Sequence, residues 1–222
     1  MIATHRVRRR LHPEVRRGEM ESAALRVFGR LGYRAATVDE IAAEAGTAKG
    51  TFYLYFESKQ AAFLHLLDDF RRLVERSFAP LEPEPAPLPA VHPVAVEALL
   101  VAAYRTFLRA VREHEALARL FLQEAVFDEA CRKRREEIYA SFAERARRDL
   151  ELAQRLGVVV RPLDPDVISN AVVGMIESVA ESWVLRGDRA DAGLDRLAAE
   201  LARFELYGVL GRPATKELRD AP

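Results

Sequence analysis

The side chains with the clearest chemical purpose lie between Gly46 and Lys59. Four of them donate or accept hydrogen bonds: Lys49, Thr51, Tyr53 and Tyr55. Phe52 and Phe56 are four residues apart and share the opposite face of a helix, where they can pack on a protein core. The major groove of duplex DNA is about 12 Å wide, admits one helix and displays donors and acceptors on the base edges. The segment therefore predicts a recognition helix from about Ala48 to Tyr55.

A recognition helix is held in place by two further helices, and the sequence predicts both of them N-terminal to it. The first ends at Gly32 and has an apolar face at helical spacing, which comprises Met20, Ala24, Val27, Phe28 and Leu31. The second begins with the capping box Thr37-Val38-Asp39-Glu40 and stops at Gly46. Ser58 is the expected N-cap of a long fourth helix. Two short helices joined by a tight glycine turn, after a longer supporting helix, describe a helix-turn-helix.

Apolar residues recur at helical spacing along the whole chain, which predicts an all-α fold. Six prolines between Pro80 and Pro93 interrupt this pattern and predict a linker. After the linker we expect helices near 94–112, 115–127, 129–156, 165–186 and 191–210.

The composition is that of an ordinary folded protein. Its 222 residues include 34 Lys or Arg and 34 Asp or Glu, and half of them are apolar. The single Cys131 excludes an internal disulfide and a cysteine-rich zinc site, and it predicts a reducing, cytoplasmic compartment. No apolar signal sequence follows the basic N-terminus, so we expect no export. The longest apolar stretch, at 167–185, contains Glu177 and Glu181, so we expect no transmembrane helix.

The zero net charge conceals an excess of basic residues at the N-terminus. Residues 1–59 carry eleven Lys or Arg and seven Asp or Glu, a surplus of four. A positive segment favours a polyanion, because phosphates neutralised by lysine and arginine release counterions. A solvated, arginine-rich surface without a partner is the alternative, and the charge alone leaves both open.

A longer string of residues resembles a known family. In order, it comprises Phe28, Gly32-Tyr33, Thr37-Val38-Asp39-Glu40-Ile41-Ala42, Ala45-Gly46, Lys49-Gly50-Thr51-Phe52-Tyr53, Tyr55-Phe56 and Ser58-Lys59. Residues from about 16 to 66 thereby resemble the DNA-binding domain of the TetR family of transcriptional regulators. Ala48 departs from the pattern, because such proteins often carry there a serine that caps the recognition helix. Thr47 is the expected substitute for this cap.

Carried over position by position, the resemblance implies a set of DNA contacts. The side chains that face the groove would be Lys49, Thr51, Tyr53, Leu54 and Tyr55. Lys49 and Thr51 would contact base edges, and the tyrosines phosphate or sugar, because a phenol donates well but discriminates poorly. Thr37 and Lys59 would contact phosphates from the starts of the second and fourth helices. The arginines at 6, 8, 9, 10, 16 and 17 either extend along the DNA or belong to a solvated tail.

Specific binding needs two half-sites, because one short helix contacts too few bases, so we expect a homodimer on a palindromic DNA operator. The segment 165–186 has two stripes that fit this. The first suits the body of the protein and comprises Ile168, Val172, Met175, Ile176, Val179 and Trp183. The second is left for a partner subunit and comprises Val167, Ala171, Gly174, Ser178 and Leu185. The resemblance implies a four-helix interface built by 165–186 and 191–210 of each subunit. A fully buried helix in a monomer is the alternative.

The resemblance also implies a small-molecule pocket among the fourth to eighth helices, whose occupation tilts the fourth helix and changes the spacing of the two recognition helices. The expected pocket residues are His65, Tyr104, Phe107, Phe121, Glu124, Phe127, Tyr139 and Met175. Few Asn or Gln side chains are available for sugar hydroxyls, so a hydrophobic effector fits better, either an acyl thioester or an aromatic acid. At each position, an ordinary core or surface side chain is the alternative.

The expected organisation has six parts: a basic arm at 1–12, a helix-turn-helix domain at 13–57, a connecting helix at 58–79, a proline-rich linker at 80–93, a helical effector-binding and dimerisation domain at 94–211, and a tail at 212–222. We expect a repressor that the effector releases from its operator. The alternative is a helical ligand-binding or interaction protein of the same fold that does not act through DNA.

Catalytic motifs are incomplete in this chain. His114-Glu115 begins a zinc-protease pattern, but Ala118 stands where the second histidine is needed. Gly46 to Thr51 superficially resembles a phosphate-binding loop, but a threonine follows its second glycine where a lysine is needed. We therefore expect no enzyme, no cofactor, no metal site and no membrane partner.

Overall fold

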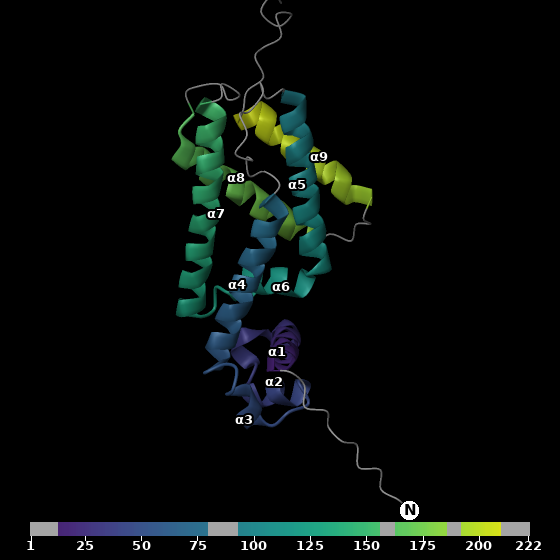
Figure 1. The fold of residues 1–222 in the computed structure, drawn as a ribbon, viewed down its shortest axis with the longest axis vertical. Coiled ribbons are helices and arrows are strands. Elements are labelled where there is room, and N and C mark those ends of the chain that lie inside the picture. Colours follow the sequence, from purple (N-terminus) through teal and green to yellow (C-terminus); the bar gives the residue numbers. More distant parts are fainter. Residues whose placement is uncertain (1–12, 80–92, 156–162, 186–191, 210–222) are drawn as a thin grey trace, which may run out of the picture. The chain divides into compact units, whose positions relative to one another are not determined.

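The computed structural model describes residues 13–79, 93–155, 163–185 and 192–209, and every element in these ranges is helical (Figure 1). The predicted all-α fold is confirmed. The chain divides into two compact units, Met1–Leu66 and Leu67–Pro222. The boundary lies inside helix α4 (Lys59–Phe78), which contributes residues to both units. None of the described helices is both long and apolar enough to span a membrane.

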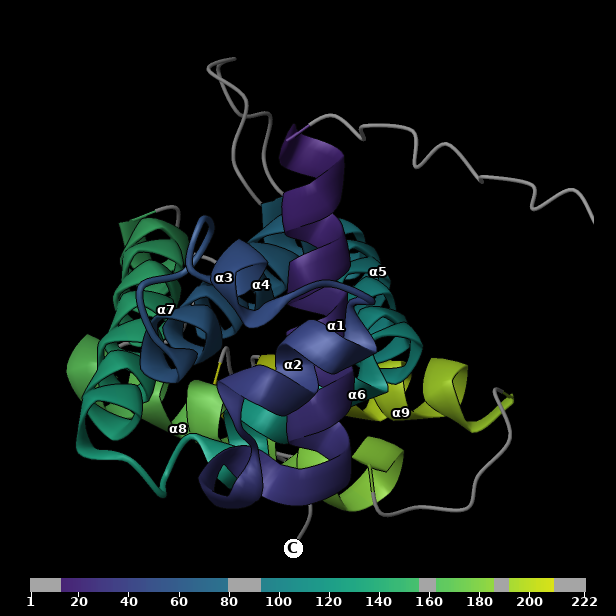
Figure 2. The same cartoon turned by 90° about the horizontal axis from the view of Figure 1, so that it is seen from below.

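The N-terminal unit contains α1 (Pro13–Ala35), α2 (Val38–Glu44), α3 (Lys49–Phe52) and the start of α4. Figure 2 shows α2 lying across α1, with α3 close to α2. Gly32 interrupts α1 with a φ of 76°, a left-handed conformation that glycine adopts without steric cost. The sequence therefore located this break correctly, although a further helical turn follows it up to Ala35.

Apolar side chains from all four helices form the core of this unit. They comprise Met20, Ala23, Ala24, Val27, Phe28, Ile41, Ala42, Phe52, Phe56, Ala62, Phe63 and Leu66. Three rings from α1 and α4 pack edge to face, a geometry that aromatic pairs favour. The ring centroids of Phe28 and Phe63 are 5.2 Å apart, and those of Tyr33 and Phe63 are 4.6 Å apart. This core fixes the scaffold on which α3 is mounted.

The C-terminal unit continues from the second half of α4 through five further α-helices in the described residues. They comprise α5 (Pro93–Glu113), α6 (Glu115–Arg119), α7 (Glu129–Arg155), α8 (Pro165–Val179) and α9 (Ala192–Phe204). Within this unit α5 packs against α9, and α7 packs against α8 (Figure 1). The proline-rich linker was predicted to end at Pro93, but Pro93 is the first residue of α5, a position where proline's missing N–H leaves no bond unmade. The other linker positions, 80–92, lie outside the described residues.

Three of these helices end in π-helical segments, in which the chain winds more widely than in an α-helix. They comprise η2 (Leu120–Glu124), η3 (Ala180–Leu185) and η4 (Glu205–Val209). In η3 the change of winding shifts the two predicted stripes. Leu185 is 3% exposed and Trp183 is 42% exposed, the reverse of the prediction. Leu185 therefore does not belong to the stripe left for a partner.

Candidate functional site

The turn between α2 and α3 has a defined hydrogen-bonded geometry. The backbone N–H of Thr47 donates to the carbonyl of Ala42, and that of Gly46 donates to the carbonyl of Ala43, both at 2.9 Å. These two bonds form a Schellman motif, which closes a helix through a residue of positive φ. Gly46 has that conformation, with a φ of 64°. Because only glycine adopts it freely, this residue fixes the angle at which α3 leaves α2.

Helix α3 presents one side to the core and the other to solvent. Phe52 is fully buried and Phe56 nearly so, as their spacing predicted. Leu54 is 78% exposed, Tyr53 is 50% exposed, and Lys49 is exposed. Thr51 and Tyr55 are partly buried. The predicted groove-facing residues thus gather on one short segment, with its most accessible side chains at the two ends.

The helix is shorter than predicted. Its α-helical part spans Lys49–Phe52, and tighter bonds extend the turn: the N–H of Leu54 donates to Thr51 and that of Tyr55 to Phe52, at 3.2 and 2.9 Å. Ala48 is the N-cap residue, with no side-chain cap. Thr47 does not replace that cap, because its hydroxyl donates back to the carbonyl of Ala42 at 3.4 Å. The start of α3 therefore has no side-chain cap.

The capping box predicted at α2 is confirmed. The hydroxyl of Thr37 accepts the N–H of Glu40 at 3.2 Å, and the Glu40 carboxylate accepts the Thr37 N–H at 2.8 Å. The Thr37 hydroxyl also donates to that carboxylate at 2.8 Å. Thr37 therefore orients α2, and its contact with a phosphate stays a prediction.

Ion pairs tie the exposed charges of the unit to one another. Lys49 Nζ lies 2.8 Å from Asp39 Oδ2, and this hydrogen bond raises the pKa of Lys49. Glu44 of α2 accepts hydrogen bonds from Arg26 and Arg30 of α1, at 2.7 and 3.1 Å, and these bonds lower the pKa of Glu44. The pairing of Lys49 had no signal in the sequence, because Asp39 is ten residues away on another helix.

Lys59, the first residue of α4, has a structural environment that the sequence did not reveal. Its ammonium donates to three backbone carbonyls, those of Tyr33 and Ala36 at 2.8 Å and that of Arg34 at 3.3 Å. It also lies 4.7 Å from the centroid of the Tyr33 ring. Lys59 therefore holds the connection between α1 and α2 against the start of α4, and its contact with a phosphate stays a prediction.

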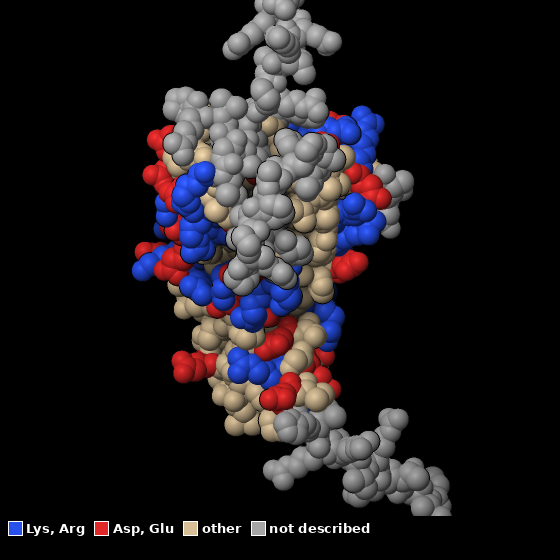
Figure 3. Space-filling model, turned by 45° about the horizontal axis from the view of Figure 1, so that its top comes forward, with Lys and Arg blue, Asp and Glu red and all other residues tan. Residues whose placement is uncertain are grey.

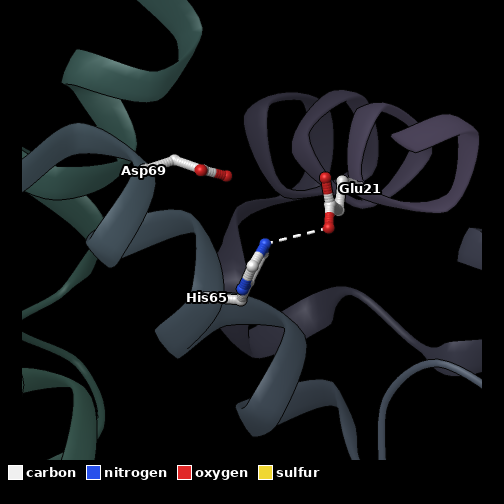
Figure 4. A group of neighbouring side chains, drawn as sticks. All are labelled: Glu21, His65 and Asp69. Carbon is white, nitrogen blue, oxygen red and sulfur yellow. Dashed lines mark ion pairs between the residues drawn. The ribbon is translucent and has the colours of Figure 1, made fainter. Parts of the chain in front are cut away.

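His65 lies in the N-terminal unit. Figure 4 shows its imidazole directed at Glu21 of α1, with Nε2 2.9 Å from Oε1. Glu21 also accepts a hydrogen bond from Arg17 at 3.0 Å. Arg16 and Arg17, which the sequence allowed as DNA contacts, are therefore helical residues paired with acids one turn away.

Basic and acidic residues balance in the described part of this unit. Between residues 13 and 59 there are seven of each kind. The surplus of four in residues 1–59 is therefore due to the arginines at 6, 8, 9 and 10, which lie outside the described residues. On the face of the molecule in Figure 3, basic and acidic side chains are interspersed.

Comparison with known proteins identifies this arrangement. Residues 22–66 match the family described as "Bacterial regulatory proteins, tetR family". The chain is 31% identical over 196 residues to the uncharacterized HTH-type transcriptional regulator YdgC of Bacillus subtilis, covering 87% of this chain and 92% of that protein. This chain belongs to the TetR family.

Solved structures share the fold of this TetR-family regulator. The fatty acid degradation regulator FadR from Bacillus halodurans superposes with a TM-score of 0.73 at 22% identity, covering 89% of this chain and 97% of that chain. FadR from Bacillus subtilis in complex with stearoyl-CoA superposes with a TM-score of 0.71 at 20% identity, covering 86% and 98%. The exposed segment from Lys49 to Tyr55 is accordingly part of the helix-turn-helix of a DNA-binding transcriptional regulator.

The C-terminal unit of this TetR-family regulator contains a cavity of about 290 Å³ lined by residues of α4, α5, α7, α8 and η4. Its wall is mainly apolar and aromatic, and it includes Phe70, Phe78, Tyr104, Phe107, Tyr139 and Phe142. Tyr104, Phe107 and Tyr139 were predicted pocket residues. The first stripe of α8 also contributes, through Ile168, Val172 and Ile176.

The other predicted pocket residues lie elsewhere. Phe121 is buried behind the wall, with its ring stacked on Phe70 at 4.3 Å. Phe127 is 48% exposed, and neither Glu124 nor Met175 lines the cavity. Sequence reasoning missed one wall residue of particular chemistry, Glu205, because no motif distinguishes it from the other glutamates of the chain.

Proposed function

We propose that this regulator is a repressor that binds a palindromic operator as a homodimer and leaves it when a small hydrophobic effector enters the cavity. The observation that carries the proposal is the two-sided geometry of α3, whose phenylalanines are buried while Lys49, Tyr53 and Leu54 point to solvent. A helix of this length contacts few base pairs, so an operator must be selected by two copies acting together.

The contacts divide by chemistry. Lys49 can reach a guanine acceptor once it leaves Asp39, and Leu54 offers an apolar surface to a thymine methyl group. Thr51 completes the base contacts. Tyr53 and Tyr55 donate to phosphate or sugar, with Thr37 and Lys59 beside them at helix ends that favour anions.

Helix α8 supplies the surface for a second subunit. Along one face, Val167, Ala171, Gly174 and Ser178 are exposed. Three of them are small, which lets two helices approach closely, and Phe204 at the end of α9 is also exposed. Large apolar side chains left in solvent favour a partner, because burying them stabilises the assembly.

Release by an effector follows from the course of α4. Its second half supplies four wall residues of the cavity, Phe70, Val74, Glu75 and Phe78, and its first residue is Lys59. A ligand that displaces this wall therefore acts on the same helix that holds the α1–α2 connection. The neighbour solved with stearoyl-CoA supports an acyl thioester as effector, and the aromatic wall supports an aromatic compound.

The fully buried thiol of Cys131 suits the proposed reducing cytoplasm. One specific observation favours the alternative, a ligand-binding protein without DNA action: both lysines proposed for DNA are engaged with the protein itself.

Fluorescence anisotropy decides between the two functions. Labelled duplexes covering both flanks of the protein's own gene are titrated with the full chain, against random duplexes of equal length, over a range of salt concentrations. We expect one fragment to bind at least about a thousandfold more tightly than random DNA. Equal affinity for all duplexes at physiological salt would refute the proposal.

Two variants test the roles of the side chains. Lys49→Ala should reduce the preference for the operator, by about 1–3 kcal/mol at the base pair concerned, and leave random DNA little affected. Lys133→Ala, an exposed lysine of α7, is the matched control and should change neither. Native mass spectrometry tests the dimer, and a monomer at micromolar concentration would contradict the role of α8.

A further inference from the structure

Two tyrosine–glutamate pairs line the effector cavity, and they differ in whether an arginine of the protein is bound to the carboxylate. Arg135 donates to both Tyr139 of α7 and Glu177 of α8, and Tyr104 of α5 donates to Oε2 of Glu205 in η4. All four residues belong to the cavity wall. Each pair therefore places a carboxylate against a phenol at the surface of an apolar space.

The first pair holds a cation supplied by the protein. Arg135 lies 2.6 Å from Glu177, and its guanidinium carbon is 4.7 Å from the centroid of the Tyr139 ring. The same guanidinium donates to the Tyr139 hydroxyl at 3.4 Å. The carboxylate is thus neutralised, and the face of the ring is occupied by a cation, an arrangement that both groups favour.

The second pair has no such cation. In the part of the chain that the structure describes, no Lys, Arg or His lies within ion-pair distance of Glu205, whose polar partner is the Tyr104 hydroxyl. Burial raises the pKa of Glu205, and the nearby Asp149 raises it further. A buried carboxylate without a counter-ion is costly, so this position gains free energy from any cation that reaches it.

Two further aromatic rings line the cavity next to Tyr104. Tyr104 is 1% exposed, and its ring centroid lies 5.8 Å from that of Phe78, with the planes nearly perpendicular. Phe78 lies in turn 5.7 Å from Phe107. Aromatic rings and a carboxylate that line one cavity are the groups that bind quaternary ammonium and protonated amines.

The other carboxylates of the wall are paired with arginines. Glu75 lies 2.6 Å from Arg71, and Glu177 lies 2.6 Å from Arg135. The remaining wall carboxylate is Asp149, and the wall's own Arg is Arg145. That guanidinium donates to the carbonyl of Phe78 at 2.8 Å and lies 3.7 Å from Asp149. A free carboxylate or phosphate bound beside Glu205 would therefore face a carboxylate of like charge.

We propose that the effector of this regulator is a hydrophobic cation, whose ammonium group binds at Glu205 among the rings of Tyr104, Phe78 and Phe107. The inference rests on the proposed function in taking the cavity as the effector site. Of the two effector classes proposed above it favours an aromatic compound, one that carries a positive charge, because an acyl chain has no cation to place at Glu205.

The test uses three probes with one skeleton and different charges: 4-phenylbutyltrimethylammonium, 4-phenylbutanol and 4-phenylbutyrate. Isothermal titration calorimetry measures their binding to the full-length protein at pH 7. We expect the cation to bind about tenfold or more tightly than the alcohol, and the anion more weakly than the alcohol. Equal binding of the cation and the alcohol, or tightest binding of the anion, would overturn the inference.

Two variants locate the cation. Glu205→Gln should lower the affinity for the cation about tenfold and change the affinity for the alcohol by no more than about twofold. The reason is that the amide keeps the shape of the side chain but not its charge. Glu200→Gln, at an exposed glutamate of α9, is the matched control and should leave all three affinities unchanged. If Glu205→Gln fails to fold, the order of the three affinities measured on the native protein still tests the inference. Equal loss of cation and alcohol affinity in a folded Glu205→Gln protein would contradict the site.

Release of operator DNA, measured by anisotropy with the same probes, separates this inference from the proposed function. Binding of the cation without release of DNA would sustain the cation site and overturn effector-driven release. Release by 4-phenylbutyrate but not by the cation would sustain the proposed function and overturn the cation site.

Discussion

The three hydrogen bonds of the Lys59 ammonium predict that this lysine stabilises the N-terminal unit. Lys59→Met keeps most of the apolar stem beside Tyr33 but removes the charge that satisfies the carbonyls of residues 33, 34 and 36. A hydrogen bond to a charged group contributes about 1.5–3 kcal/mol, and a cation over a ring about 0.5–1 kcal/mol at an exposed site. Water can replace the donor at the exposed carbonyl of Arg34, so we expect a loss of about 2–3 kcal/mol rather than the sum over three bonds.

Native-state hydrogen exchange followed by mass spectrometry measures this loss locally. Peptides from 13–66 should exchange about 30- to 150-fold faster in Lys59→Met, whereas peptides from 93–155 should be unchanged. A local measurement is needed because two compact units need not unfold together. Lys49→Met is the matched control, since its ammonium contacts an exposed side chain, Asp39, and no backbone carbonyl of the core.

The same variant separates the scaffold role of Lys59 from a contact with DNA. If the lysine acts on DNA through the fold, a stabilising osmolyte should restore the affinity of Lys59→Met for the operator. If it also contacts a phosphate, the salt dependence of binding should lose about one unit of slope under all conditions. Unchanged exchange in peptides 13–66 would refute the reasoning from the three carbonyls.

Three further results are expected. Thr37→Ala should lower the free energy of unfolding of the N-terminal unit by about 1 kcal/mol in urea titrations, because it removes the N-cap hydroxyl of α2; a loss of DNA affinity without any loss of stability would contradict this. Leu54→Ser should weaken operator binding without lowering the melting temperature, since the side chain is 78% exposed; a lower melting temperature would show that it packs on the protein. The pKa of Glu205 is raised in the folded state above its ordinary value of 4.5. As the pH rises past 4.5, the unfolded chain therefore loses this proton more readily than the folded protein does. Glu205 thus lowers the free energy of unfolding at neutral pH. Glu205→Gln should therefore be more stable than the native protein at pH 7, with a difference that disappears as the pH falls below 4.5; a constant difference across this range would contradict it.

Local rules were enough for most elements of the DNA-binding part. The capping box from Thr37 to Glu40, the turn at Gly46 and the start of α4 at Ser58 each depend on residues within one helical turn of each other. The burial of Phe52 and Phe56 follows from helical spacing alone. A sequence states such short-range relations directly, which is why the helix-turn-helix could be located before any coordinates were considered.

Relations between distant residues were decided by the tertiary structure. Lys59 contacts carbonyls 23 to 26 residues earlier, and Tyr104 meets Glu205 across 101 residues. No local pattern encodes either contact. The π-helical winding after Val179 similarly exchanged the environments of Trp183 and Leu185, because a stripe drawn at the α-helical period fails where the period changes.

The sequence by itself thus determined the helical fold, the family and the position of the helix-turn-helix, since these depend on spacing along the chain. Only the folded protein decided which charges remain without a counter-ion. Lys49 is neutralised by Asp39 and Glu177 by Arg135, whereas Glu205 meets a phenol within the described residues. The physical reason is that electrostatic pairing depends on distance in space and on burial, and both are set by packing between helices.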